Sequence, residues 1–86
     1  LLGNTSPVTT IDLNFTGTYG IKVNPAKTFT LNNIKINLSG TATPVLQNNG
    51  NLILNNTEVK GNVNPVLSNI GTGTMQVQGL STVRKI

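Results

Sequence analysis

An internal repeat is the feature that most constrains this chain. The tripeptide Leu-Asn-Asn at 31–33 returns at 54–56, a spacing of 23, and Pro-Val-Leu at 44–46 returns at 65–67, a spacing of 21. A repeat of this length is typical of a solenoid, in which each repeat stacks on the one before it. The repeat therefore points to a stacked architecture before any single residue is considered.

The residues within each repeat alternate as they do in short strands. A fainter copy at 11–17 matches 34–40 at the same spacing of 23, and it alternates Ile11, Leu13 and Phe15 with polar residues. Strict alternation predicts a half-buried strand, and the Gly, Asn and Pro residues between the runs predict turns. No run is long enough for a helix, so we expect an all-β chain.

Three short strands within one such period describe a coil of a parallel β-helix. Each strand would pair with the same strand of the next coil, about 4.8 Å away, so that residues one period apart stack in columns. We expect a single domain, 1–86, of three to four coils, with coils at 10–31, 32–54 and 55–77 and a tail at 78–86 that begins another coil. The expected inward columns are Ile11/Ile34/Thr57, Leu13/Ile36/Val59, Ile21/Val45/Val66 and Leu31/Leu54/Val77.

Asparagine is the most abundant residue type, with 14 copies, and many of them fall at the expected corners. Asn tolerates the left-handed backbone conformation of tight corners, and stacked amides can hydrogen-bond along a column. We therefore expect two Asn ladders, one formed by Asn24, Asn48 and Asn69 and the other by Asn32 and Asn55.

Composition argues against several classes of function. The net charge of +4 comes from six scattered cations and two acids, and only three aromatic residues accompany them, so we expect no nucleic-acid partner. The chain has no Cys and no His, which removes thiolate metal sites and the commonest catalytic base, and we expect no metal or cofactor. No apolar run approaches the roughly 18 residues of a membrane helix, so we expect no membrane insertion.

The two acids, Asp12 and Glu58, each lie at a spacing of 23 from Lys35. In the expected register the three side chains form one outward column, with the acids about 9.6 Å apart. That separation suits the carboxyl pair of an inverting glycosidase. However, Lys35 between them would keep both carboxylates ionised, so neither would serve as a general acid. We therefore expect a charge ladder and no enzyme activity.

Leu46 and Leu67 are the candidates for a subunit contact. If Val45 and Val66 point inward, alternation turns the two leucines outward in one column, which would form an apolar interface. The alternative is that the short strand is kinked and that both leucines belong to the core.

The ends of the chain suggest that it is part of something larger. The start, Leu-Leu-Gly, has neither a Met nor a basic stretch, so we expect a fragment or a processed piece and no signal peptide. A stack this short leaves open strand edges unless it is capped, continued or assembled. We therefore expect a segment of a longer fibrous protein that forms a homotrimer.

The stretch at 48–62, NNGNLILNNTEVKGN, resembles the coil repeat of right-handed β-helices of the pectate-lyase-like superfamily. The resemblance extends over residues 10–79. That superfamily includes polysaccharide lyases, bacterial surface adhesins, and the trimeric tailspikes, tail fibres and appendages of bacteriophages. The resemblance implies a non-enzymatic structural segment of such a phage protein, on the virion surface, that contacts host-surface glycans as a homotrimer.

Two other functions stay open at this point. The chain could belong to a polysaccharide-degrading β-helix enzyme whose catalytic acids lie on other coils. It could also belong to a bacterial surface adhesin or autotransporter passenger, on the cell surface or in the extracellular space. Upstream sequence would discriminate, since clustered acids favour the enzyme, a signal peptide favours the adhesin, and a virion-anchoring domain favours the phage protein.

Overall fold

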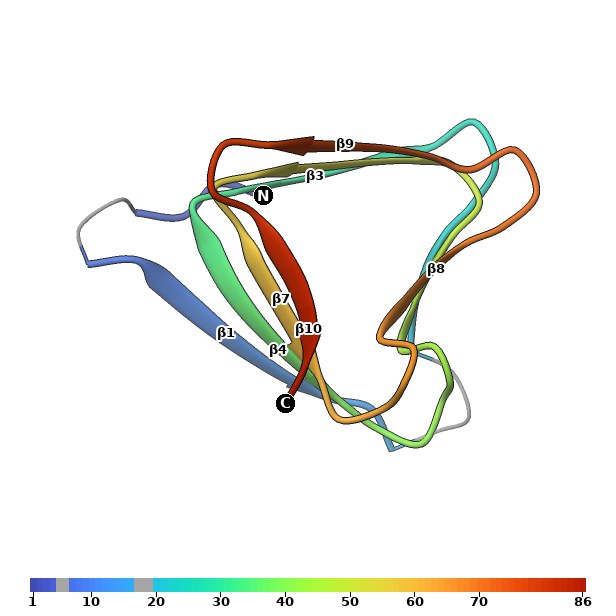
Figure 1. Cartoon of the computed structure of the whole chain (residues 1–86), viewed down its shortest axis with the longest axis horizontal. Coiled ribbons are helices and arrows are strands. Elements are labelled where there is room, and N and C mark those ends of the chain that lie inside the picture. The colour runs from blue at the N-terminus through green and yellow to red at the C-terminus, as the bar shows by residue number, and fades with distance from the viewer. Residues whose placement is uncertain (5–6, 17–19) are drawn as a thin grey trace.

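The computed structural model describes residues 1–4, 7–16 and 20–86. Within these ranges the chain forms ten strands and no helix, which confirms the all-β prediction. Figure 1 shows the strands winding around a common axis as stacked coils. The strands are β1 (Thr9–Asn14), β2 (Ile21–Val23), β3 (Thr28–Asn32), β4 (Ile34–Ser39), β5 (Leu46–Asn48), β6 (Asn51–Asn55), β7 (Glu58–Gly61), β8 (Leu67–Asn69), β9 (Thr74–Gln78) and β10 (Thr82–Lys85).

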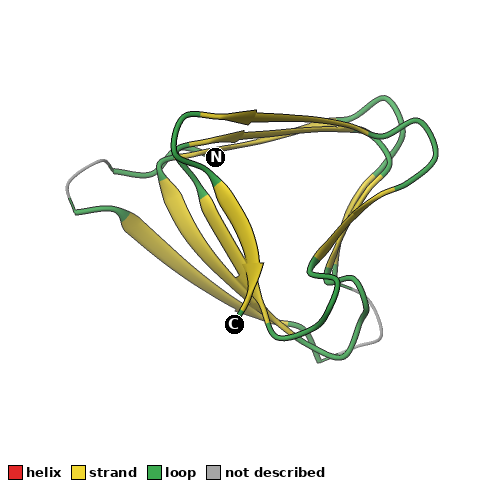
Figure 2. Ribbon diagram, in the orientation of Figure 1, coloured by secondary structure: helices red, strands yellow, loops and turns green. Residues whose placement is uncertain are grey.

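The strands stack into three parallel sheets, one strand from each coil. The sheet β1-β4-β7-β10 has four strands, and the sheets β2-β5-β8 and β3-β6-β9 have three each. Figure 2 shows the three sheets as the sides of a triangular prism. Outside these strands, Leu2 makes an isolated parallel bridge to Asn32. The chain is therefore a parallel β-solenoid of about three coils, with the sequence period that the repeat predicted.

The register of the sheet β3-β6-β9 confirms the predicted spacing of 23. Leu31 lies opposite Leu54, which lies opposite Val77, and the three form one column. In the four-stranded sheet, Ile36 lies opposite Val59, again as predicted. These columns are correct because the partners in each pair are 23 positions apart, as in the repeat.

The register of the first coil differs from the prediction by two residues. Ile11 lies opposite Ile36, not Ile34, and Leu13 lies opposite Leu38, not Ile36. The cause is a change in corner length: four residues, 24–27, join β2 to β3, whereas two residues, 49–50, join β5 to β6. A shift of two residues keeps every side chain on the same face of the sheet, so the hydrophobic pattern does not reveal it.

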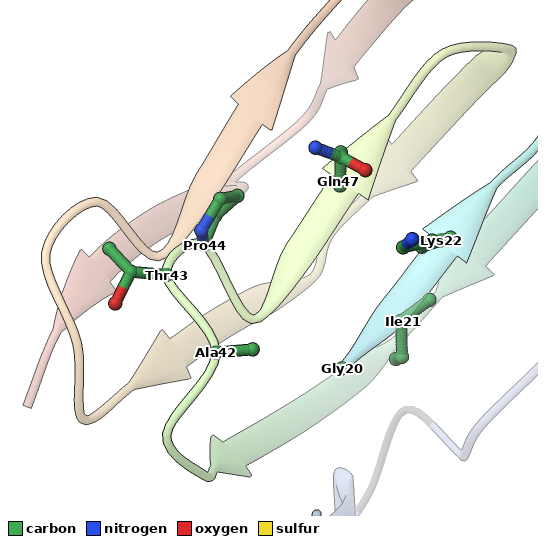
Figure 3. Close-up of a pocket in the computed structure, with 7 residues that line it drawn as sticks. All are labelled: Gly20, Ile21, Lys22, Ala42, Thr43, Pro44 and Gln47. Carbon is green, nitrogen blue, oxygen red and sulfur yellow. The ribbon is translucent and has the colours of Figure 1, made fainter. Parts of the chain in front are cut away.

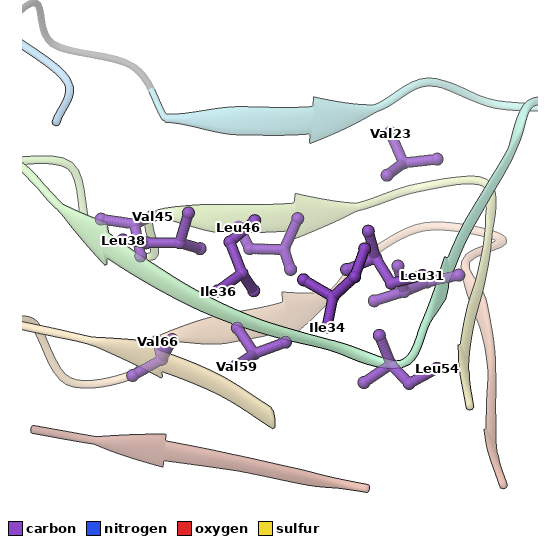
Figure 4. Close-up of a cluster of buried hydrophobic side chains, with 11 residues drawn as sticks. Val23, Leu31, Ile34, Ile36, Leu38, Val45, Leu46, Leu54, Val59 and Val66 are labelled. Carbon is purple, nitrogen blue, oxygen red and sulfur yellow. The ribbon is translucent and has the colours of Figure 1, made fainter. Parts of the chain in front are cut away.

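The core lies inside the prism and is filled mainly by the middle coil. Figure 4 shows aliphatic side chains from all three sheets meeting there. The side chains of the outer strands, such as Ile11 and Val83, are half-buried and pack against this cluster. The buried apolar residues are Val23, Leu31, Ile34, Ile36, Leu38, Val45, Leu46, Leu52, Leu54, Val59 and Val66.

The predicted interface at Leu46 and Leu67 is wrong. Leu46 is 1% exposed and lies inside the core beside Val45, and Leu67 is half-buried against the same cluster. In the sheet β2-β5-β8, Leu46 lies between Ile21 and Leu67, so Ile21 does not lie opposite Val45 as expected. Val45 stands just before the strand, at the corner, where strand alternation does not apply. The alternative, that the leucines belong to the core, is therefore correct for Leu46, and Leu67 packs against that core.

Asn residues do occupy a left-handed corner, but one position later than the expected ladder. Asn33 and Asn56 join the sheet β3-β6-β9 to the four-stranded sheet with φ values of 56° and 48°, and Gly79 continues this corner with a φ of 62°. Because a left-handed conformation is costly for most L-residues but tolerated by Asn and Gly, these residue types suit this corner.

Candidate functional site

Both acids of the chain lie on the outer face of the four-stranded sheet, but they do not share a column. Asp12 lies opposite Asn37, whose side-chain nitrogen donates a 2.7 Å hydrogen bond to Asp12 Oδ1. Lys35 lies opposite Glu58, as predicted, and opposite Thr10 on its other side. The predicted charge ladder Asp12/Lys35/Glu58 is therefore wrong at Asp12, for the same two-residue change of register.

Glu58 pairs with cations other than the one expected. Its carboxylate lies 3.5 Å from Lys60 Nζ and 3.7 Å from Arg84 Nε. These partly exposed pairs contribute little to stability. The described residues contain no group of three or more His, Cys, Asp or Glu side chains that could hold a metal ion. Both acids of this face therefore already have partners.

One Asn ladder forms in part. Asn48 Nδ2 donates a 2.7 Å hydrogen bond to Asn69 Oδ1 in the next coil, which is the predicted contact. Asn24 lies outside this ladder, because Val23 is the residue opposite Asn48. The second pair, Asn32 and Asn55, lies in register as expected.

A hollow of about 210 Å³ lies beside β2 and β5 (Figure 3). Lys22 and Gln47 come from the strands, and Thr43 and Pro44 come from the preceding corner. Among the described residues the lining includes one cation and no acid, so it can bind a polar group but offers no acid–base pair. The described residues that line it are Gly20, Ile21, Lys22, Ala42, Thr43, Pro44 and Gln47.

A larger hollow, of about 410 Å³, crosses the corner between the sheets β2-β5-β8 and β3-β6-β9. The connections at this corner are four residues long in the first and third coils, 24–27 and 70–73, but two residues long in the second coil, 49–50. In Figure 1 the longer connections project beyond the shorter one at this corner. We call this hollow the corner groove; it is lined by Ala26, Lys27, Thr28, Asn49, Gly50, Asn51, Thr72 and Thr74.

Gly50 makes the short connection possible. It is buried, and a Cβ atom there would overlap the backbone carbonyl oxygens of Asn24 and Lys27. Gly50 N donates a 3.1 Å hydrogen bond to Asn48 Oδ1, and Asn51 N donates a 2.8 Å bond to Lys27 O. These contacts hold the second coil close beneath the projecting connection of the first coil.

The Asn side chains of the corner groove use their oxygen atoms to join neighbouring coils. Asn49 Oδ1 accepts a 3.2 Å hydrogen bond from Thr72 N, and Asn51 Oδ1 accepts a 3.1 Å bond from the Thr74 hydroxyl. Within the described ranges, neither Asn49 Nδ2 nor Asn51 Nδ2 donates to a protein group. The groove therefore presents hydrogen-bond donors.

The sequence predictions did not include the corner groove. Lys27, Asn49 and Asn51 lie outside the predicted ladders and in no recognisable motif. The available signal was the difference in length between the connections Asn-Pro-Ala-Lys at 24–27 and Asn-Gly at 49–50. That difference becomes visible only when the strands are paired correctly.

In the described part of the chain, no helix is both long and apolar enough to cross a membrane. Comparison of the chain with family models, curated proteins and solved structures gives no match. A proposal about the function of this chain therefore rests on the geometry of the solenoid and of its outer surfaces.

Proposed function

We propose that this chain is a non-enzymatic structural segment of a bacteriophage tailspike, tail fibre or appendage, on the virion surface, where it contacts host-surface glycans. The observation that carries the proposal is the continuous stacking of parallel strands in all three sheets. A solenoid adds one coil at a time along an axis, so it suits a stiff segment of a longer fibre. The stretch at 48–62 resembles right-handed β-helices, and we propose the right-handed winding on the same basis.

The arrangement of the acids supports a structural role. Asp12 accepts a hydrogen bond from Asn37, and Glu58 lies between two cations. A glycosidase needs one protonated carboxyl as general acid and a second carboxylate across the scissile bond. Asp12 and Glu58 lie in different columns of the sheet, so they do not face each other as such a pair. We therefore propose that these residues belong to a polar outer surface and do not perform catalysis.

We also propose a homotrimer, as in the proteins that the repeat resembles. The contact cannot use Leu46, because this side chain lies in the core. Three copies around one axis would present three equivalent surfaces, so that weak contacts to a repeating glycan reinforce one another. The trimer would be held by outer faces or by further parts of the protein.

Immunogold electron microscopy tests this proposal. Antibodies raised against the folded chain are applied to the source culture, to purified phage particles and to washed host cells. Labelling of the tail or its appendages is the expected result. Labelling of the bacterial surface in the absence of phage would contradict the proposal and favour an adhesin, and labelling of neither would contradict it as well.

A further inference from the structure

We infer that the corner groove binds a carboxylate-bearing glycan. The inference rests on the proposed function, because it names the class of glycan and the site of contact. Three features support it: the extent of the groove across the coils, its two amide donors, and its positive charge.

The shape favours an extended ligand that lies along the axis of the solenoid. The lining includes Thr28 from β3, Asn51 from β6 and Thr74 from β9, which are successive partners in one sheet. The groove therefore crosses all three coils. Its volume of about 410 Å³ lies in the range of small-ligand sites and suits a few sugar units.

The donors favour a ligand that is rich in acceptor oxygens. The oxygens of Asn49 and Asn51 accept from Thr72 N and the Thr74 hydroxyl, which leaves the two amide nitrogens able to donate to a ligand. A donor binds hydroxyl, ring or carboxylate oxygens, and its bond to a carboxylate is the stronger one.

The charge favours an anionic ligand over a neutral one. Lys27 is exposed and is the only titratable side chain among the described residues that line the groove. Asp12 and Glu58 lie on another sheet, so no acid lines the groove beside Lys27.

A nucleic acid would need several cations and aromatic stacking partners, which the described residues of the lining do not supply. A stable contact with a second protein copy would need about 800 Å² from each partner, far more than this groove provides.

The test uses two oligosaccharides of equal length and linkage that differ only in the carboxylate: a β-1,4-linked oligoglucuronate and the matching oligoglucose. Binding to the ¹⁵N-labelled chain is followed by NMR, which resolves side-chain amide signals. We expect the oligoglucuronate to shift the amide signals of Asn49 and Asn51 and to bind at least about tenfold more tightly than the oligoglucose, since a hydrogen bond to a charged group is the stronger kind.

A matched pair of lysine variants separates the groove from the overall charge. Lys27→Gln and Lys35→Gln remove the same charge, but Lys35 lies on the four-stranded sheet, away from the groove. We expect Lys27→Gln to weaken oligoglucuronate binding about tenfold or more and Lys35→Gln to leave it within about twofold. Equal loss in both variants would overturn the proposal, because it would mean attraction to net charge alone.

A second pair tests the amide donors without disturbing the fold. In Asn51→Asp the side-chain oxygens can still accept from the Thr74 hydroxyl, but the amide donor is lost and a negative charge is added. Gln76→Glu adds the same charge on the exposed face of β9 and keeps the acceptor for Gln78 Nε2. We expect Asn51→Asp to abolish measurable binding while Gln76→Glu weakens it about twofold.

Shifts that map elsewhere on the chain, or equal affinity for the two oligosaccharides, would overturn the inference. Neither result would bear on the immunogold experiment, so the proposed function would stand. Conversely, selective oligoglucuronate binding by a chain that labels bacterial cells would support the groove and contradict the phage assignment.

Discussion

Asn48 Nδ2 lies 2.7 Å from Asn69 Oδ1, and the bond joins two coils from the inside of a corner. Asn48 is 0% exposed, and its amide also donates to Thr74 O at 2.8 Å and accepts from Gly50 N at 3.1 Å. Burying a polar side chain is costly unless its hydrogen bonds are made, and the Asn48 amide makes three. Asn48 therefore holds the second and third coils together at the corner that forms the groove.

Replacing this amide should destabilise the fold strongly. In Asn48→Ala, Gly50 N and Thr74 O lose buried partners, so we expect the free energy of unfolding to fall by about 2–4 kcal/mol. Asn37→Ala is the control, because it removes one exposed bond to Asp12 and should cost less than about 1 kcal/mol. Urea denaturation followed by circular dichroism measures both, and equal losses would contradict the role assigned to Asn48.

Gly50 should be irreplaceable in the short connection. In Gly50→Ala the new methyl group meets the carbonyl oxygens of Asn24 and Lys27, which are backbone atoms, so we expect a loss of about 1–3 kcal/mol. In Gly40→Ala the nearest atoms belong to Phe15 and lie 3.2 Å away, so the cost should be less than about 1 kcal/mol. A Gly50→Ala variant as stable as Gly40→Ala in thermal unfolding would show that the corner is looser than described.

A charge at Leu46 should unfold the chain and not merely separate subunits. Because Leu46 lies in the core, Leu46→Lys buries an unpaired ammonium, and we expect loss of the cooperative unfolding transition. A Leu46→Lys chain that stays folded but becomes monomeric would restore the leucine interface that the structure excludes.

Sedimentation equilibrium of the unmodified chain tests the proposed homotrimer, for which a stable monomer at micromolar concentration is the contradicting result.

The chain should release no product from polysaccharides. We expect neither reducing ends nor unsaturated uronates when it is incubated with a panel of bacterial polysaccharides, because its two acids lie in different columns and have other partners. Product that disappears in Asp12→Asn or Glu58→Gln would contradict a structural role and favour the enzyme alternative.

The sequence contained enough information for the solenoid and for much of its core. The column Leu31/Leu54/Val77 was predictable because the chain between these residues has the same length in both coils. The contact between Asn48 and Asn69 was predictable because the two asparagines have the same spacing as the two Pro-Val-Leu repeats.

The register between β1 and β4 and the presence of the corner groove were not predictable from the hydrophobic pattern. Ile11 to Phe15 fits the strand at 34–40 equally well at a spacing of 23 or 25, since both place the same side chains inward. The length of the connection at 24–27 decides between the two spacings, but it can be assigned only when the ends of β2 and β3 are known. The charge column at Asp12 and the lining of the groove both depend on that assignment.

Disulfide trapping tests the register most directly, because the chain has no Cys of its own. Two double variants share one position: Thr10→Cys with Lys35→Cys, and Asp12→Cys with Lys35→Cys. Thr10 lies opposite Lys35, about 4.8 Å away, whereas Asp12 lies two residues further along the strand, about 8 Å from Lys35. A disulfide requires Cα atoms less than about 7 Å apart, so we predict rapid oxidation of the first pair and none of the second. Rapid oxidation of the Asp12→Cys/Lys35→Cys pair alone would restore the spacing of 23 and contradict the register described for the first coil.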